Sequence, residues 1–147
     1  MGHCGYYRRF IYMYADVARP LYTLLIVFEW SEECEVAFQK LKNALISAPI
    51  LKAPDWNKIF HVHIDASAYA IGCILAQPYE NNMDFPVSYS SRQLNSAEKI
   101  YTTTDGEGLA MVYAVKKFRH YLLANKFILF TNHHALLYLV NKPCLTG

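Results

Sequence analysis

The sequence predicts an α/β fold built on a mixed sheet, and three observations support this prediction. Short apolar segments at 59–65, 70–77 and 85–90, joined by polar turns, are typical of an antiparallel meander. A long segment after them repeats apolar residues at helical spacing. A further strand, Phe127–Thr131, follows that helix. The order strand, helix, strand predicts parallel pairing through a right-handed crossover.

The composition indicates a folded, core-forming chain. Its 147 residues suit one domain with or without a short arm, and 54% hydrophobic against 18% charged residues excludes disorder. A net charge of +2 permits nucleic-acid binding without predicting it. The four cysteines lack CxxC spacing, which favours reduced thiols in an intracellular protein. We expect neither a transmembrane helix nor a signal peptide.

The first 29 residues are predicted to form a helical arm. Gly5–Leu25 suits one or two short helices, with Asp16 as a cap of the second and Pro20 in its first turns. A stronger helix begins after Ser31, a good N-cap. Its apolar residues recur at helical spacing, which predicts a packing role: Cys34, Ala37, Phe38, Leu41 and Leu45.

The first strand ends on a carboxylate, Asp65. Because side chains alternate along a strand, Asp65 shares one face with His61 and His63. A carboxylate in an apolar strand needs a partner or a cation, which makes Asp65 a candidate site residue. The alternative is that Asp65 caps the strand and bonds the turn at Ala66–Ser67.

The long helix carries a second acid on its apolar face. Thr104-x-x-Glu107 matches a capping box, and Asp105 should be solvated. Glu107 heads a stripe that predicts a face packed on the sheet: Ala110, Met111, Ala114, Phe118 and Tyr121. Glu107 is therefore predicted to point toward the sheet. The alternative is that Glu107 only closes the capping box.

The end of this helix and the end of the last strand carry further candidates. Lys116, Lys117, Arg119 and His120 complement the helix dipole or contact a nucleic acid. Asn132 follows the last strand, before His133-His134 and a short predicted helix at 135–140. Since sites collect at the carboxyl ends of strands, we expect Asp65, Glu107 and Asn132 to converge.

A zinc site is a separate hypothesis. His61, His63 and Asp65 share a strand face, and His133 and His134 can approach from the parallel strand. The spacing lacks the usual closed set of zinc ligands, so this hypothesis is the less favoured one.

Several ordered blocks resemble the ribonuclease H-like region of gypsy-type long-terminal-repeat retrotransposon Pol polyproteins. They are WSEECEVAFQKLKNALISAPIL, IDASAYAIGCILAQ, VSYSSRQLNSAEKIYTTTDGEGLAMVYAVKKFRHYL and FTNHHALLYL. The preceding segment resembles the piece that joins reverse transcriptase to this region. The resemblance implies an arm at 1–29, a ribonuclease H-like domain at 30–142 that is C-terminally truncated, and a tail at 143–147.

The resemblance also implies a site that binds Mg²⁺ or Mn²⁺ and cuts RNA in RNA–DNA hybrids. Asp65 matches the family's first acid and Glu107 its second. The third, an Asp in Thr-Asp-His, is Asn132 here, and the fourth acidic position has no counterpart in the chain. An amide cannot supply the negative charge that attracts a second cation. We therefore expect little or no nuclease activity.

Two alternatives to a nuclease remain open. One is a nucleic-acid-binding module that holds a hybrid through Arg92, Lys116, Lys117 and Arg119. The other is a structural relic whose open sheet edge promotes aggregation. The resemblance implies as partners a hybrid or another nucleic acid and the remainder of a Pol polyprotein, with no membrane. It implies an intracellular location, in the cytoplasm, a virus-like particle or the nucleus.

Overall fold

A computed structural model describes residues 7–47, 51–79 and 83–132. The predicted turn at 80–84 falls mostly outside them, and His133, His134, the helix at 135–140 and the tail at 143–147 lie outside them entirely. Within the described residues, no helix is both long and apolar enough to cross a membrane.

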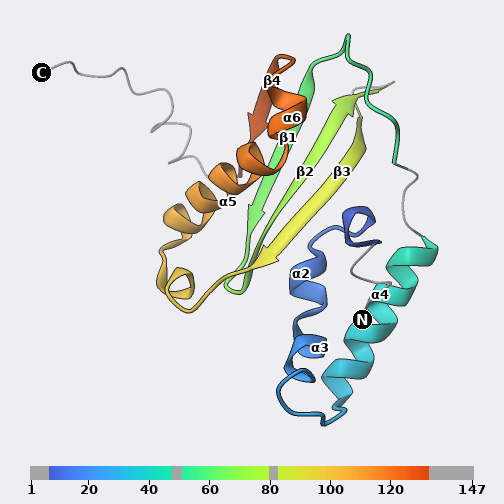
Figure 1. Ribbon diagram of the computed structural model, residues 1–147, viewed down its shortest axis with the longest axis vertical. Coiled ribbons are helices and arrows are strands. Elements are labelled where there is room, and N and C mark those ends of the chain that lie inside the picture. The colour runs from blue at the N-terminus through green and yellow to red at the C-terminus, as the bar shows by residue number, and fades with distance from the viewer. Residues whose placement is uncertain (1–6, 48–50, 80–82, 133–147) are drawn as a thin grey trace, which may run out of the picture.

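A four-stranded mixed sheet forms the centre of the fold (Figure 1). Its strands are β1 (Phe60–Ala66), β2 (Ala70–Pro78), β3 (Asp84–Gln93) and β4 (Phe127–Phe130), in the order β3-β2-β1-β4. β2 pairs antiparallel with β1 and with β3, while β4 pairs parallel with β1. The predicted meander and the parallel crossover are therefore confirmed.

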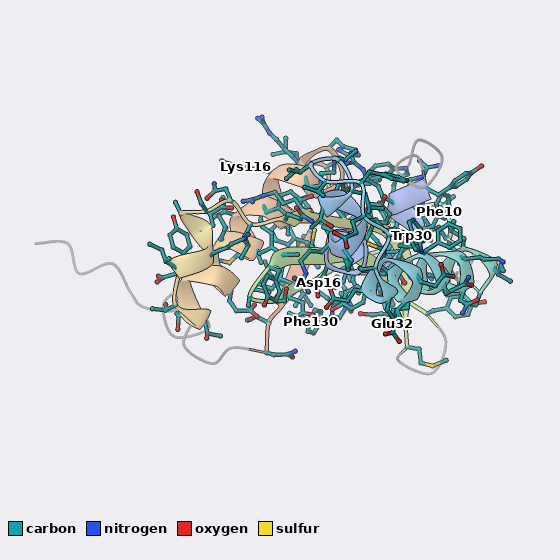
Figure 2. The ribbon with its side chains drawn as sticks, turned by 90° about the horizontal axis from the view of Figure 1, so that it is seen from below. Phe10, Asp16, Trp30, Glu32, Lys116 and Phe130 are labelled. Carbon is teal, nitrogen blue, oxygen red and sulfur yellow. The ribbon has the colours of Figure 1, made fainter. Side chains whose placement is uncertain are left out.

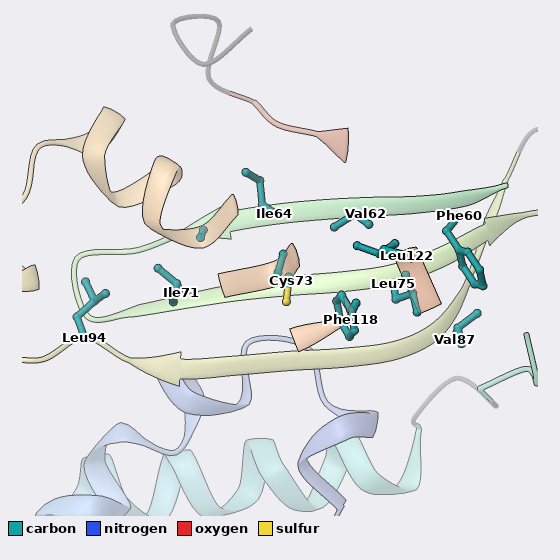
Figure 3. Close-up of a cluster of buried hydrophobic side chains, with 12 residues drawn as sticks. Phe60, Val62, Ile64, Ile71, Cys73, Leu75, Val87, Leu94, Phe118 and Leu122 are labelled. Atoms are coloured by element: carbon teal, nitrogen blue, oxygen red, sulfur yellow. The ribbon is translucent and has the colours of Figure 1, made fainter. Parts of the chain in front are cut away.

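The main core lies between the sheet and the helices α5 (Thr103–Lys117) and α6 (Arg119–Leu122). Alternate residues of β1 and β2 enter it, because strand side chains alternate between the two faces. Figure 3 shows this cluster, which includes Phe60, Val62, Ile64, Ile71, Cys73, Leu75, Phe118 and Leu122. The predicted apolar stripe supplies its helical side, although the long helix breaks at Phe118 into α5 and α6.

The start of α5 differs from the predicted capping box. The helix begins at Thr103, and the N-cap is Thr102, whose Oγ1 accepts a hydrogen bond from the backbone N–H of Asp105 at 3.2 Å. Thr102 Oγ1 also donates to Asp105 Oδ2 at 2.6 Å. The cap thus begins two residues before the predicted Thr104. Asp105, three residues after the N-cap, therefore takes the capping-box position that the sequence predicts for Glu107.

A second apolar cluster joins the arm to the long helix that follows it. The arm contains a 3₁₀ turn η1 (Tyr7–Phe10), α2 (Tyr14–Val17) and α3 (Arg19–Thr23). The helices α2 and α3 pack on α4 (Glu32–Ile46), whereas η1 contacts β3. Ser31 caps α4 as predicted, with Oγ accepting from the N–H of Cys34 at 3.3 Å. The cluster contains Ile11, Tyr14, Ala18, Leu21, Cys34, Ala37 and Leu41.

Two details of the arm differ from expectation. Asp16 does not cap the second helix: it lies within α2, and the N-cap of α3 is Ala18, which has no side-chain cap. Phe38 is not buried in the α4 stripe, and its ring instead meets Trp30 edge-on at 6.1 Å. Pro20 lies at the start of α3 as predicted, where a missing N–H costs little.

The arm covers the face of the sheet opposite α5. Figure 2 labels Glu32 on α4 and Lys116 on α5, which lie on opposite sides of the sheet. A Cβ at Gly72 of β2 would collide with Met13 Sδ, so the glycine lets this side chain lie directly on the strand. Met13 itself has a left-handed backbone, with φ of 48°. The backbone N–H of Ala15 also donates to Ser91 Oγ at 2.9 Å.

We expect Gly106→Ala to stabilise the domain. Gly106 lies in the first turns of α5, and an added Cβ would lie 3.8 Å from Ala66 Cβ, an ordinary van der Waals contact. Alanine favours a helix by about 0.5–1 kcal/mol over glycine. Urea unfolding should show a gain of this size with an unchanged m-value. A loss of stability would show that the added methyl group does not fit against Ala66 of β1.

Candidate active site

Asp65 lies near the carboxyl end of β1 and meets a side chain from the arm. The hydroxyl of Tyr12 donates a hydrogen bond to Asp65 Oδ2 at 2.5 Å. The turn after β1 is held instead by Ser67, whose Oγ accepts from the N–H of Ala70 at 3.1 Å. The structure therefore gives Asp65 a tertiary partner, and Ser67 performs the turn-capping role considered for Asp65.

Glu107 is brought to the same end of β1. Its side chain is buried, with 7% exposure, on the face of α5 that packs on the sheet. Gly106 and Ala66, the residues next to the two acids, face each other where α5 begins and β1 ends. The predicted inward orientation of Glu107 is confirmed, and Asp105 is exposed as expected.

The two carboxylates act together on the Tyr12 hydroxyl. Partial burial raises the pKa of Tyr12 above its usual value, and the hydrogen bond to Asp65 and the negative charges of Asp65 and Glu107 raise it further. Tyr12 therefore remains a neutral donor at physiological pH. Its ring also contacts that of Tyr89 on β3, at a centroid separation of 6.2 Å.

Asn132 lies just beyond β4 and is exposed. β4 runs parallel to β1, with Phe130 opposite His63. Asp65 lies two residues after His63, and Asn132 lies two residues after Phe130. Both therefore lie at the same end of the sheet, where β1 and β4 finish. The backbone thus supports the expected convergence of Asn132 with the two acids.

The donor set at this edge suits one hard divalent cation. Asp65 and Glu107 offer carboxylate oxygens and Asn132 an amide oxygen, the ligand types that Mg²⁺ and Mn²⁺ prefer. Two negative charges are available, and Tyr12 occupies one oxygen of Asp65. The residues fit a single cation better than a pair.

The candidate basic residues fall into two groups. Lys116 and Lys117, in the last turn of α5, and Arg119, at the start of α6, are exposed. Arg92 is engaged elsewhere: its guanidinium forms two hydrogen bonds with Glu98, at 2.7 and 2.9 Å. These bonds hold the pKa of Glu98 below its usual value. Three of the four basic side chains are therefore exposed to solvent, where they can contact a phosphate backbone.

The sequence did not point to two residues that the structure brings to this face. Tyr12 belongs to no recognisable sequence motif, and only the docking of the arm brings its hydroxyl into hydrogen-bond contact with Asp65. Asp84, at the end of the turn predicted at 80–84, instead begins β3 and contacts His61 and His63. The predicted zinc set therefore changes: among the described residues the cluster contains Asp84, and Asp65 is not part of it.

A mixed sheet, a helix packed on it, and an acid near the end of β1 with a second acid in the first turns of α5 are typical of a ribonuclease H-like domain. Residues 30–129 match the family described as "RNase H-like domain found in reverse transcriptase". This chain belongs to that family of RNase H-like domains, and the resemblance to retrotransposon Pol polyproteins is confirmed.

Two of the similar curated proteins are polyproteins of Drosophila melanogaster. The chain is 42% identical over 146 residues to the retrovirus-related Pol polyprotein from transposon 297 and 40% identical over 142 residues to that from transposon 412. These matches cover 96% and 95% of this chain. The chain spans only 13% and 11% of the length of these relatives.

Solved structures support the fold. A foamy viral protease-reverse transcriptase bound to double-stranded DNA matches 97% of this chain and 26% of its own, with a TM-score of 0.78 and 20% identity. A second, in complex with RNA/DNA hybrid, matches 99% of this chain and 21% of its own, with a TM-score of 0.71 and 19% identity.

Proposed function

We propose that this chain is a ribonuclease H-like domain that binds RNA–DNA hybrids and has little or no cleaving activity of its own. Membership of the family of RNase H-like domains found in reverse transcriptase supports the substrate class. The foamy viral neighbour, which was solved with an RNA/DNA hybrid, supports it as well. The proposed division of the chain keeps 1–29 as the arm, 30–142 as the domain and 143–147 as the tail.

The proposed catalytic site consists of Asp65, Glu107 and Asn132, at the end of the sheet where β1 and β4 finish. Asp65 and Glu107 would hold a divalent cation, and Asn132 would offer it a neutral oxygen. Divalent metal held there would supply the activation of a water and the stabilisation of the leaving oxygen of a phosphodiester. The chain's own residues contribute the charge and position of two carboxylates.

The contact between Tyr12 and Asp65 carries the proposal of low activity. The phenol hydroxyl binds Oδ2 of the first acid at 2.5 Å, so a cation must displace this hydrogen bond before it can use that oxygen. Asn132 adds a second obstacle, since replacing a carboxylate by an amide removes one negative charge from the site. Both features lower the affinity for a second cation.

We propose that the hybrid binds to the exposed basic side chains at the end of α5 and the start of α6. Lys116, Lys117 and Arg119 lie in succession on α5 and α6. Arg92 is a weaker contributor, because a phosphate must compete with Glu98 for its guanidinium.

One set of measurements on a labelled RNA–DNA hybrid tests both parts of the proposal. We expect binding whose log affinity falls with log salt, and the double variant Lys116→Ala/Lys117→Ala should reduce the slope by about 2. The matched variant Lys40→Ala/Lys42→Ala, on exposed positions of α4, should leave it unchanged.

The same hybrid reports cleavage. We expect RNA cleavage in Mg²⁺ to be no faster for the wild-type chain than for Asp65→Ala. Rapid wild-type cleavage that Asp65→Ala abolishes would refute the proposed low activity. Salt-independent binding, or equal effects of the two lysine pairs, would refute the proposed binding surface.

A further inference from the structure

A cluster of two histidines and one aspartate lies on the sheet face turned away from α5. His61 and His63 belong to β1, and Asp84 is the first residue of β3. His61 Nδ1 lies 2.8 and 2.9 Å from the two oxygens of Asp84, and His63 Nε2 lies 2.6 Å from Oδ2. Both rings thus direct a nitrogen at one carboxylate from alternate positions of the same strand.

We propose that His61, His63 and Asp84 bind one transition-metal cation of the Zn²⁺ type, at a site separate from the Asp65–Glu107 pair. One ligand atom from each residue lies within 4.8 Å of the other two. Ligands about 2.0–2.1 Å from a tetrahedral ion are about 3.3 Å apart, so small side-chain movements bring the three atoms to bonding distance.

The chemistry of the three ligands selects the metal. Two imidazole nitrogens and one carboxylate suit Zn²⁺, whereas Mg²⁺ prefers oxygen ligands alone. Three protein ligands leave a fourth position for water. The side chains of His61, His63 and Asp84 are 15%, 36% and 25% exposed, so the cluster is partly buried yet open to an entering ion.

Neighbouring side chains hold the two rings in place. The ring of Phe130 on β4 stacks on His63 at 4.7 Å and 12°, and meets His61 edge-on at 4.9 Å. This packing limits rotation of both imidazoles, so less entropy is lost when a metal binds. Asp65, the next residue on this face of β1, is directed to Tyr12 instead.

The bound metal would link β1 to the start of β3, which are separated by β2 in the sheet. A ligand that binds only the folded state stabilises it, and three side chains drawn from two strands form such a site only after folding. The site therefore acts as a structural clamp that does not depend on catalysis or hybrid binding.

Isothermal titration with ZnCl₂ tests the site on the full chain, with excess MgCl₂ present to occupy oxygen-only sites. We expect one equivalent of Zn²⁺ to bind and to raise the Tm. Asp84→Asn and His63→Gln should each lower the affinity about 100-fold or more. The matched variant His120→Gln, which changes an exposed histidine of α6, should bind as the wild type does. Equal binding by Asp84→Asn and wild type would overturn the proposal.

Imidazole nitrogen NMR of the wild-type chain gives a second readout that does not depend on the folding of any variant. Zn²⁺ should shift the resonances of His61 Nδ1 and His63 Nε2. Shifts confined to other histidines, or zinc uptake without any imidazole shift, would assign the metal elsewhere and overturn the proposal.

Discussion

Combining Tyr12→Phe with Asn132→Asp is expected to raise magnesium-dependent cleavage of an RNA–DNA hybrid at least about 100-fold above the wild-type level. The first change removes the hydroxyl that binds Asp65 Oδ2, while a phenyl ring keeps the contact with Tyr89. The second change adds a negative charge at the carboxyl end of β4. Charge stabilisation by a bound metal is worth several kcal/mol, which corresponds to a rate factor of about this size.

Single variants and one triple variant separate the contributions to this gain. Adding Asp65→Ala to the double variant should return cleavage to background, because the first acid is then absent. Tyr12→Phe alone should increase Mg²⁺ binding with little gain in cleavage. If the double variant cleaves no faster than the wild type, then neither the phenol nor the amide accounts for the low activity.

Replacing Phe60 by Ala is expected to lower the free energy of unfolding by about 3–5 kcal/mol. Phe60 is 0% exposed at the start of β1. Its ring meets Trp56 of the preceding segment edge-on at 6.0 Å and Tyr121 of α6 at 5.8 Å. Its removal leaves a cavity and breaks both aromatic contacts.

Phe28→Ala is the matched control, because Phe28 is 85% exposed and the same atoms are deleted. Its effect on stability should stay within about 0.5 kcal/mol. Urea unfolding followed by tryptophan fluorescence measures both variants. Similar losses for the two variants would contradict the assignment of Phe60 to the core between the sheet and α5.

Local patterns in the sequence were sufficient to predict the elements that form the site. The period-two alternation of β1 predicted the face of Asp65, and the helical stripe of α5 predicted the inward direction of Glu107. The cap of α5 was predicted two residues late. Thr102 and Thr104 each precede an acid by three positions, so short-range spacing does not distinguish the two registers.

The domain packing was harder to predict. α4 has the clear amphipathic pattern of a packed helix, and the pattern identifies its buried side without identifying its neighbour. In the structure α4 shares a core with the arm, through residues such as Leu21 and Leu41, and not with the sheet. A hydrophobic stripe can be buried against any complementary apolar surface, so the partner depends on the tertiary fold.

By itself, the sequence determined the mixed sheet and the crossover to β4, and it led to the prediction that Asp65, Glu107 and Asn132 converge at the carboxyl ends of β1 and β4. Only the tertiary structure placed Tyr12 on Asp65, across 53 residues of chain, and Asp84 on His63, across 21. Strand and helix periods arise from backbone geometry and are visible in neighbouring residues. A contact between distant side chains depends on how whole elements dock, which no local period encodes.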